Sequence, residues 1–345
     1  MSVTMAAGPK RVDPAAIERE LESLWISLPP AGGSSATPMS MRAIVANLIA
    51  LRDSERATDE ALGVIGNIIG NNPCRVILIT SEPDIDPPEL MADIAIICQK
   101  SETCRRCVCC DYIRLAGRGI MADNLPSMAA TLVVSDLPVA VWWPKPPFDR
   151  KDFIVFAGQA NRVIVDSAAY SRDDMKQLAR FVEQTRRMGT AVSDLNWARL
   201  TPYRQIFAQF FDSPECRDHL ARIQSVRIEA DTSTGLLIAG WLKAQLDKSG
   251  YPLAREWIAL VPAAGAVVSF QSLAMTCAAG KKSFTVTRRN ESTIEARSVL
   301  DAQTMNRVVK AVLPPEDKLL GDELTFSGRD AIFETALASA AALED

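Results

Sequence analysis

Two patterns of apolar residues alternate along the chain, one typical of buried strands and one typical of amphipathic helices. Arg75–Thr80 is rich in β-branched residues with little polar alternation, which predicts a strand covered on both faces. Thr58–Asn71 and Arg172–Met188 instead repeat apolar residues at helical spacing. The second of these places acidic residues first and basic residues last, as the helix dipole favours. The alternation predicts an α/β layer with mixed strand pairing.

The stretch from Thr131 to Tyr170 is the part around which we expect this sheet to form. Its first apolar run, Leu132–Val134 continuing through Val139–Trp143, predicts one buried strand, and Arg162–Asp166 predicts a second. The prolines that follow Trp143 cannot donate to a strand ladder and should end the first strand.

The two neighbouring tryptophans, Trp142 and Trp143, fall on opposite faces of that strand. One of them should therefore approach the surface, where an indole beside rigid prolines is a candidate contact for another protein. The alternative is that both close the core at the end of the strand.

The second half of the chain places helices first and strands afterwards. Asp194–Asp212 predicts a short and a longer helix separated at Pro202, and Thr232–Asp247 predicts a buried helix. From Trp257 onward, β-type runs are separated by turn residues, and several alternate apolar with polar positions. That alternation predicts a sheet with one solvated face.

An amphipathic helix is predicted at the N-terminal end, over Asp13–Trp25, where an aspartate and a proline form a typical helix start. Pro29–Pro38 has the composition of a flexible linker, so this helix could dock on its own domain or on a partner.

These elements predict a mixed α/β (α+β) protein of two domains. Residues 1–38 form the N-terminal helix and linker, residues 39–190 a mixed α/β sheet domain, and residues 191–345 a helical segment followed by a largely antiparallel sheet domain.

Composition and charge argue against several classes of function and location. The 345 residues carry a net charge of −4, which gives no reason to expect nucleic acid or an anionic membrane as a partner. No apolar run approaches the roughly 20 residues that span a bilayer, and the first residues lack a secretory signal. We therefore expect a cytoplasmic protein.

The chain has a single histidine, His219. A site with two or three histidine ligands is therefore impossible within one chain, and a Ser-His-Asp or Cys-His arrangement would depend on this residue alone. No nucleophile-elbow sequence accompanies it. We expect no catalytic residues and no enzymatic activity.

Five of the eight cysteines lie within thirteen residues of a polar segment. These redox candidates are Cys98, Cys104, Cys107, Cys109 and Cys110. Cys104 and Cys107 form a C-x-x-C pair whose intervening arginines favour the thiolate, which is typical of reactive thiols.

A metal site is the alternative for this segment. Cys104 and Cys107 would then be completed by Cys109 or Cys110, with Cys98 or a remote thiol as a further ligand, to hold zinc or an iron–sulfur cluster. A packing role without special chemistry is the third possibility, and on that reading no cofactor is required.

Several blocks of the chain resemble the OpcA family, the glucose-6-phosphate dehydrogenase assembly proteins. In order, they are NLIAL, CRVILIT, VCCDYI, LPSMAATLVVSDLPVAVWWP, RVIVDSA, DLNWARLTPYRQIFAQFFD and LLIAGWLKAQL. The resemblance covers about 60% of the chain clearly and the C-terminal strands only loosely. Cys109 lies where the family's corresponding block has its cysteine, and Cys110, Asp111 and Tyr112 depart from that block's pattern.

The resemblance implies a non-catalytic protein that binds glucose-6-phosphate dehydrogenase, favours its active oligomer and activates it. It also implies that thioredoxin is a further partner, because members of the family in cyanobacteria act as a thioredoxin-linked redox switch. A cysteine-cluster metal protein or a dithiol redox protein is the alternative function. The candidate contacts for a protein partner are Trp142, Trp143, Trp197, Arg199, Tyr203 and Arg204.

Overall fold

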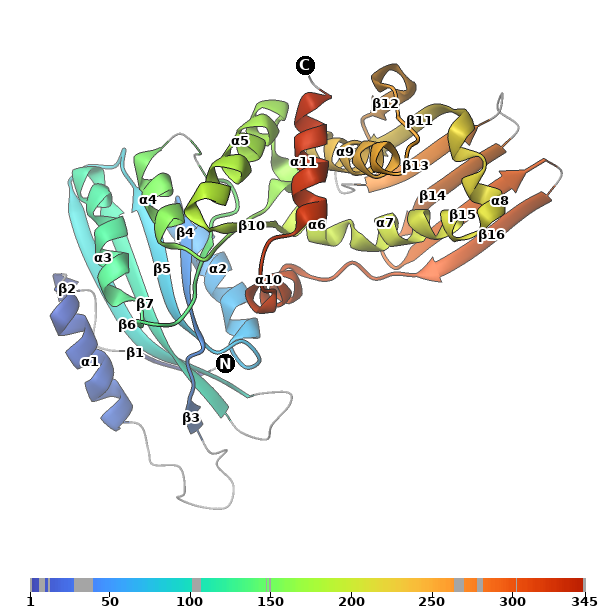
Figure 1. Cartoon of the computed structure of the whole chain (residues 1–345). Coiled ribbons are helices and arrows are strands. Elements are labelled where there is room, and N and C mark those ends of the chain that lie inside the picture. The colour runs from blue at the N-terminus through green and yellow to red at the C-terminus, as the bar shows by residue number, and fades with distance from the viewer. Residues whose placement is uncertain are drawn as a thin grey trace, which may run out of the picture. The chain divides into compact units, whose positions relative to one another are not determined.

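The structure is a computed structural model that describes residues 2–5, 10–11, 13–27, 40–100, 107–146, 148, 150–263, 270–277, 282–301 and 303–343. The predicted linker over Pro29–Pro38 and Cys104 lie outside these residues. The fold is mixed α/β, as predicted, and the chain forms two compact units (Figure 1). Unit 1 comprises Met1–Val165, Thr185–Ser193 and Glu316–Gly328, and unit 2 comprises Asp166–Gln184, Asp194–Pro315 and Arg329–Asp345.

Among the described residues, unit 1 is built on a ten-stranded sheet. Its strands are β1 (Ser2–Met5), β2 (Lys10–Arg11), β3 (Ser40–Arg42), β4 (Ala46–Arg52), β5 (Cys74–Glu82), β6 (Glu89–Lys100), β7 (Cys107–Arg118), β8 (Val139–Trp142), β9 (Arg162–Val165) and β10 (Ala191–Asp194). The main order is β1-β6-β7-β5-β4-β8-β9-β10. Strands β7, β5, β4, β8 and β9 pair in parallel, whereas β6 and β1 add antiparallel pairs at one side. The buried β-branched runs form the central parallel strands, as their lack of alternation predicts.

Helices cover this sheet. They are α1 (Pro14–Ser27), α2 (Glu55–Ile68), α3 (Leu125–Leu132), α4 (Lys151–Gln159) and α10 (Glu316–Thr325), with η1 (Gly119–Asn124) as a 3₁₀ turn and α5 (Arg172–Met188) divided between the units. The N-terminal helix α1 packs on β6 and α3, so it docks on its own unit. Helix α2 packs on β4 and β5 and contacts α10.

Unit 2 contains a six-stranded sheet in the order β12-β11-β13-β14-β15-β16. Its strands are β11 (Ile223–Ala230), β12 (Ile258–Val261), β13 (Phe270–Cys277), β14 (Lys282–Asn290), β15 (Thr293–Leu300) and β16 (Gln303–Lys310). Apart from the parallel β11–β12 pair, the strands pair antiparallel. Along β14, Phe284 and Val286 are buried while Thr285 and Thr287 are half-buried, so the two faces differ in exposure as the alternation predicts.

The helices of unit 2 include the predicted pair around Pro202. They are α6 (Leu195–Arg199), α7 (Thr201–Ala208), α8 (Pro214–Arg217), α9 (Thr232–Lys248) and α11 (Ala331–Ala342), with 3₁₀ turns η2 (Ser167–Ala169), η3 (Gln209–Asp212), η4 (Leu220–Arg222) and η5 (Arg255–Trp257). Helix α9 contacts β11 and β12, and α7 contacts β14 and β15. In the described part of the chain, no helix has the length and apolar character needed to cross a bilayer.

One predicted strand is shorter than expected. Leu132 ends α3, and the strand begins only at Val139. The side chain of Asn47 accepts a hydrogen bond from the Val134 N–H at 2.8 Å and donates to the Val134 carbonyl at 3.1 Å, so a side chain replaces a neighbouring strand there. Asp136 has a φ of 65°, a left-handed conformation that interrupts extended backbone.

Both neighbouring tryptophans are buried, which corrects the expectation that one approaches the surface. Trp142 is 0% exposed and Trp143 is 9% exposed. Trp142 ends the central strand β8, and the ring of Trp143 packs edge-on against Phe153 and Phe156 of α4. Helix α4 was not predicted, and its aromatic face provides the cover for Trp143.

Helices α9 and α11 pack backbone to backbone at Gly240. A Cβ placed on Gly240 would overlap the Ala336 carbonyl and lie 2.6 Å from the Ala340 nitrogen. Real Cβ atoms essentially never come so close to another heavy atom, so only glycine permits this approach.

We expect Gly240→Ala to lower the free energy of unfolding by at least about 2 kcal/mol, because the two helix backbones must separate. The matched control is Gly63→Ala on α2, where a Cβ meets nothing within 4 Å. That variant should gain about 0.5–1 kcal/mol from helix propensity. Urea unfolding followed by circular dichroism measures both, and equal stability of the two variants would contradict the packing described here.

Candidate functional site

A disulfide links the adjacent strands β6 and β7. Cys98 on β6 lies directly opposite Cys109 on β7, with a Cα–Cα distance of 4.1 Å and an S–S distance of 2.01 Å. Cross-strand neighbours share one face of the sheet, so the bridge needs no change in backbone position. Two of the five predicted redox cysteines therefore form a pair that the C-x-x-C spacing did not indicate.

The remaining cysteines of the segment differ in their surroundings. Cys107 is a half-buried free thiol two residues before Cys109, on the same side of β7. Cys110 points to the other side, where its Sγ donates to the Ala43 carbonyl at 3.5 Å. Burial raises the pKa of the Cys110 thiol to about 12, so it stays protonated and unreactive near neutral pH. Cys104 is outside the described residues, so its pairing with Cys107 stays a prediction.

The metal alternative includes Cys104, which lies outside the described residues, so it stays a prediction. Cys109 is bonded to Cys98, and Cys107 and Cys110 project from opposite faces of one strand. Within the ranges that the structure describes, no three histidine, cysteine or acidic side chains form a group that could hold a metal ion.

Helix α1 covers the disulfide. Its residues Leu24 and Trp25 pack against a buried cluster formed by Ile96, Cys98 and Cys109. Cys107 packs against the same cluster. The C-terminal half of α1 thus covers the disulfide, of which Cys98 is 8% and Cys109 0% exposed.

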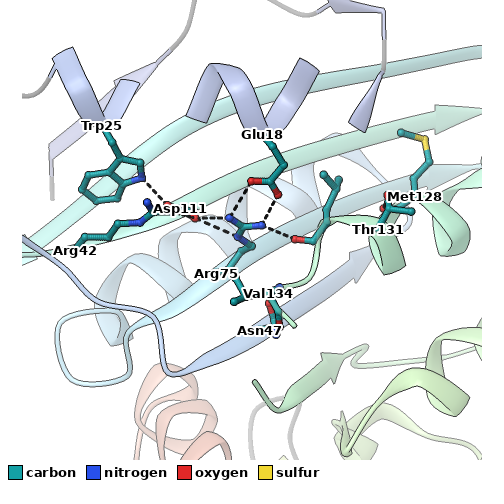
Figure 2. A network of polar contacts seen from close by, with 10 residues as sticks. Glu18, Trp25, Arg42, Asn47, Arg75, Asp111, Met128, Thr131 and Val134 are labelled. Atoms are coloured by element: carbon teal, nitrogen blue, oxygen red, sulfur yellow. Dashed lines mark hydrogen bonds and ion pairs between the residues drawn. The ribbon is translucent and has the colours of Figure 1, made fainter. Parts of the chain in front are cut away.

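A buried carboxylate next to the disulfide holds α1 in place (Figure 2). Asp111 lies two residues beyond Cys109 on the same face of β7 and is 0% exposed. The indole Nε1 of Trp25 donates to Asp111 Oδ1 at 2.7 Å. Arg42 Nη2 donates to Oδ2 at 3.0 Å, and Arg75 donates to it through Nε at 3.1 Å and Nη2 at 2.8 Å.

Arg75 extends this network to a second point of α1. It is 5% exposed, and its Nη1 donates to Glu18 Oε1 at 2.5 Å and to the Leu132 carbonyl at the end of α3 at 2.8 Å. Burial lowers the pKa of Arg75, but the hydrogen bonds to Glu18 and Asp111 more than offset it, so the pKa lies above its ordinary value. The guanidinium therefore stays charged and joins β5, β7, α1 and α3.

Sequence reasoning missed Glu18, Arg75 and Asp111 as a site. A signal was present, because Arg75 and Asp111 interrupt otherwise apolar strand runs, and charged residues are almost never fully buried unless paired. The partners could not be named without the β5–β7 register, which sets Val76 opposite Tyr112.

The residues predicted as partner contacts are mostly inside the two units. Trp142 and Trp143 are buried in unit 1, and Trp197 and Tyr203 are 5% and 4% exposed in unit 2. Arg199 forms a bidentate ion pair with Asp166 at 2.7 and 2.6 Å. The role of these predicted contact residues in binding a partner stays a prediction.

Arg204 is the sixth candidate contact, and its guanidinium lies 3.2 Å from the centroid of the Trp197 ring. The Trp197 Nε1 donates to Asp330 at 2.9 Å, so the indole is fixed from both its face and its edge. These contacts favour a structural role for Trp197 within unit 2.

Unit 2 contains a second buried carboxylate, that of Asp194, which accepts several hydrogen bonds. Asp194 is 1% exposed and accepts hydrogen bonds from the Ser167 N–H at 2.9 Å, the Ser167 hydroxyl at 2.6 Å and the Asn196 N–H at 3.0 Å. Burial, and secondarily the charge of Asp166, raise the pKa of Asp194 from 3.8 to about 7.

Comparisons with known proteins identify the family of these units. Residues 65–183 match the family model described as glucose-6-phosphate dehydrogenase subunit N-terminal domain, and residues 190–337 match the corresponding C-terminal domain. A relative from Synechocystis sp., assigned as OxPP cycle protein OpcA, is 29% identical over 194 residues, which cover 54% of this chain and 40% of that protein. One from Nostoc punctiforme with the same assignment is 32% identical over 185 residues, which cover 51% and 38%.

The match thus spans about two fifths of the length of these relatives. Among solved structures, the transcriptional regulator Gal80p from Kluyveromyces lactis has a TM-score of 0.45 at 10% identity over 94% of each chain. That similarity is too distant to indicate function.

We expect Asp111→Asn to lower the free energy of unfolding by about 3 kcal/mol, because it leaves the buried Arg75 without its second carboxylate. The control is Glu60→Gln, which breaks the exposed Arg56–Glu60 pair and should cost less than about 0.5 kcal/mol. Urea denaturation at neutral pH distinguishes them. Similar small losses in both variants would show that the network does not hold the unit together.

Unit 2 should lose stability as the pH rises. Because the folded-state pKa of Asp194 is about 7 rather than 3.8, the folded chain keeps a proton between these values that the unfolded chain releases. This stabilisation is complete below about pH 4 and disappears as the pH rises through 7. Asp194→Asn should have a flatter profile between pH 5 and 8 in thermal unfolding. Parallel profiles for the two proteins would refute this assignment.

Proposed function

The chain belongs to the OpcA family of glucose-6-phosphate dehydrogenase assembly proteins, and on that premise we propose that it is a non-catalytic protein that binds this dehydrogenase in the cytoplasm, promotes its active oligomer and activates it. The two matched family domains carry this proposal. Together they cover residues 65–183 and 190–337, which include most of both units.

Activation by binding requires only a preference for one state of the partner. A protein that binds the active oligomer more tightly than the inactive form shifts the population by the difference in binding free energy. Moving an equilibrium from 1:99 to 99:1 takes about 5.5 kcal/mol, which is within reach of an ordinary protein interface. No reaction centre in this chain is needed.

The disulfide supports thiol control of this binding. A dithiol reductant such as thioredoxin would attack one sulfur of the Cys98–Cys109 bridge, pass through a mixed disulfide, and leave with its own disulfide formed. Two electrons and two protons are thereby transferred to the chain, which is left with two thiols. Because Leu24 and Trp25 pack on this pair, the thiol state acts directly on the seating of α1.

A dithiol oxidoreductase built on the C-x-x-C pair Cys104 and Cys107 is the alternative function, and it stays a prediction because Cys104 lies outside the described residues. The Cys98–Cys109 bridge is a less suitable reaction centre, because it lies beneath α1 rather than at an accessible helix N-terminus of the kind that lowers the pKa of catalytic thiols.

A coupled assay of NADPH formation with the cognate dehydrogenase tests the proposal. Added chain should raise the rate several-fold and co-elute with the enzyme in size-exclusion chromatography with light scattering. Oxidised and reduced chain should differ in this effect, and the Cys98→Ser/Cys109→Ser double variant should lose the difference.

The matched control is Cys216→Ser, a buried free thiol of unit 2, which should keep the redox response. Unchanged kinetics and no complex in either redox state would refute the association. A complex with identical activity in both states would refute thiol control alone.

A further inference from the structure

The parallel strands of unit 1 have a reversal point between β4 and β8. β4 comes first in the parallel core, β5 and β7 then extend the sheet to one side, and β8, β9 and β10 extend it to the other. This β7-β5-β4-β8-β9-β10 order is that of the doubly wound dinucleotide-binding fold. In such sheets, ligands bind outside the carboxyl ends of the strands at the reversal point.

A cavity of about 300 Å³ lies at this point. The carboxyl ends of β4 and β8, helix α2 and the first residue of α10 form its walls. Its polar lining comes from Arg52, Asp53, Glu60, Trp142, Lys145 and Glu316. This size is at the lower end for small-molecule sites, so the cavity suits a compact metabolite.

A dinucleotide does not fit the residues present. In the dinucleotide fold, a glycine-rich turn after the first parallel strand brings backbone N–H groups to the pyrophosphate. Here the turn reads Arg52-Asp53-Ser54-Glu55, with no glycine and two acidic residues. The Ser54 side chain already accepts from the Ala57 N–H at 3.4 Å, which caps α2. The turn therefore repels and excludes a pyrophosphate.

Arg52 is one of the two cations that line the cavity, together with Lys145. Its Nη1 donates to the carbonyls of Leu51 at 2.7 Å and Trp142 at 3.3 Å, and its guanidinium lies 3.9 Å from the centroid of the Trp142 ring. With the described residues it forms no ion pair, so its other N–H groups remain available to a ligand. Burial lowers the pKa of Arg52 to about 10, while Glu316, Asp53 and Glu60 at longer range raise it, so it is charged at neutral pH.

Trp142 supplies a second, independent observation. It lines the cavity, is 0% exposed, and its indole Nε1 has no hydrogen-bond partner in the part of the chain that the structure describes. A buried donor without an acceptor is rare in folded proteins and calls for an explanation. An acceptor group of a bound ligand, reached by a small adjustment of the Arg52–Trp142 stack, would satisfy it.

The carboxylates of the lining restrict the kind of anion. Glu60 is paired with Arg56 at 3.0 Å, and Asp53 and Glu316 line the same cavity as Arg52. A simple oxyanion would be repelled by them, but a ligand that also carries hydroxyl groups can donate to them. Ala61, Val64 and Trp143 give the apolar wall against which a sugar ring packs.

We propose that this cavity binds a compact polyhydroxylated anion, either a sugar phosphate or a sugar acid, with its anionic group on Arg52 and its hydroxyls on Asp53 and Glu316. The site lies entirely within unit 1 and can be tested on the isolated chain. Its presence does not depend on the proposed association with the dehydrogenase.

Isothermal titration calorimetry of the full chain distinguishes the ligand sources. Glucose 6-phosphate probes the sugar phosphate and gluconate the sugar acid, while glucose and inorganic phosphate each present half of the chemistry. At least one of the first two should bind with a Kd below about 1 mM, and both half-ligands at least tenfold more weakly. Absence of binding by both glucose 6-phosphate and gluconate up to about 10 mM would overturn the proposal.

Arg52→Met should raise the Kd at least tenfold, because it removes the charge and all the donors while keeping the length of the side chain. Arg19→Met is the control, since Arg19 is exposed on α1 and does not line the cavity, and it should leave the Kd unchanged. Arg52→Lys keeps the charge but loses the planar guanidinium. It is the second variant in case Arg52→Met does not fold, and it should bind the ligand several-fold more weakly than the wild-type chain. Equal affinity of wild-type chain and a folded Arg52 variant would refute the assignment.

Discussion

The buried carboxylate of Asp111 is the interaction on which one face of unit 1 depends. Its charge lies on a central strand with no access to water, so it is tolerable only because Arg75, Arg42 and Trp25 all donate to it. Those donors come from β5, β3 and α1, which are far apart in sequence. Satisfying one carboxylate therefore fixes where three separate segments sit. Glu18 adds a second attachment of α1 through the same Arg75.

The Asp111 network and the disulfide lie next to each other under the same helix, α1. Cys109 precedes Asp111 by two residues on the same face of β7, so the helix that the carboxylate anchors is also the helix that covers the bridge. Leu24 and Trp25 pack on the cluster that contains the bridge, and the indole of Trp25 also donates to Asp111, so the proposed thiol control would act through these contacts. Trp25 therefore contacts both the disulfide cluster and the carboxylate that anchors α1. In a binding protein, such a helix is a means of changing the surface offered to a partner.

Local pattern predicted much of the fold, and the parts it missed have physical reasons. α5, α9 and β5 have strong helical or apolar patterns and were predicted almost to their ends. β16 was missed because nearly all of its side chains are exposed and polar or mixed, which leaves no alternation to detect.

The site itself depends on long-range pairing that a single sequence does not encode. The sequence singled out the five clustered cysteines as redox candidates, but the Cys98–Cys109 bridge follows from the antiparallel β6–β7 register. The burial of Trp143 follows likewise from α4, a short helix whose apolar run resembles a strand.

The most direct test of the coupling between disulfide and helix is amide hydrogen exchange of the oxidised and the reduced chain, read by mass spectrometry. Reduction should speed exchange in α1 while α9 of unit 2 stays protected, whereas identical exchange of α1 in both states would contradict the account.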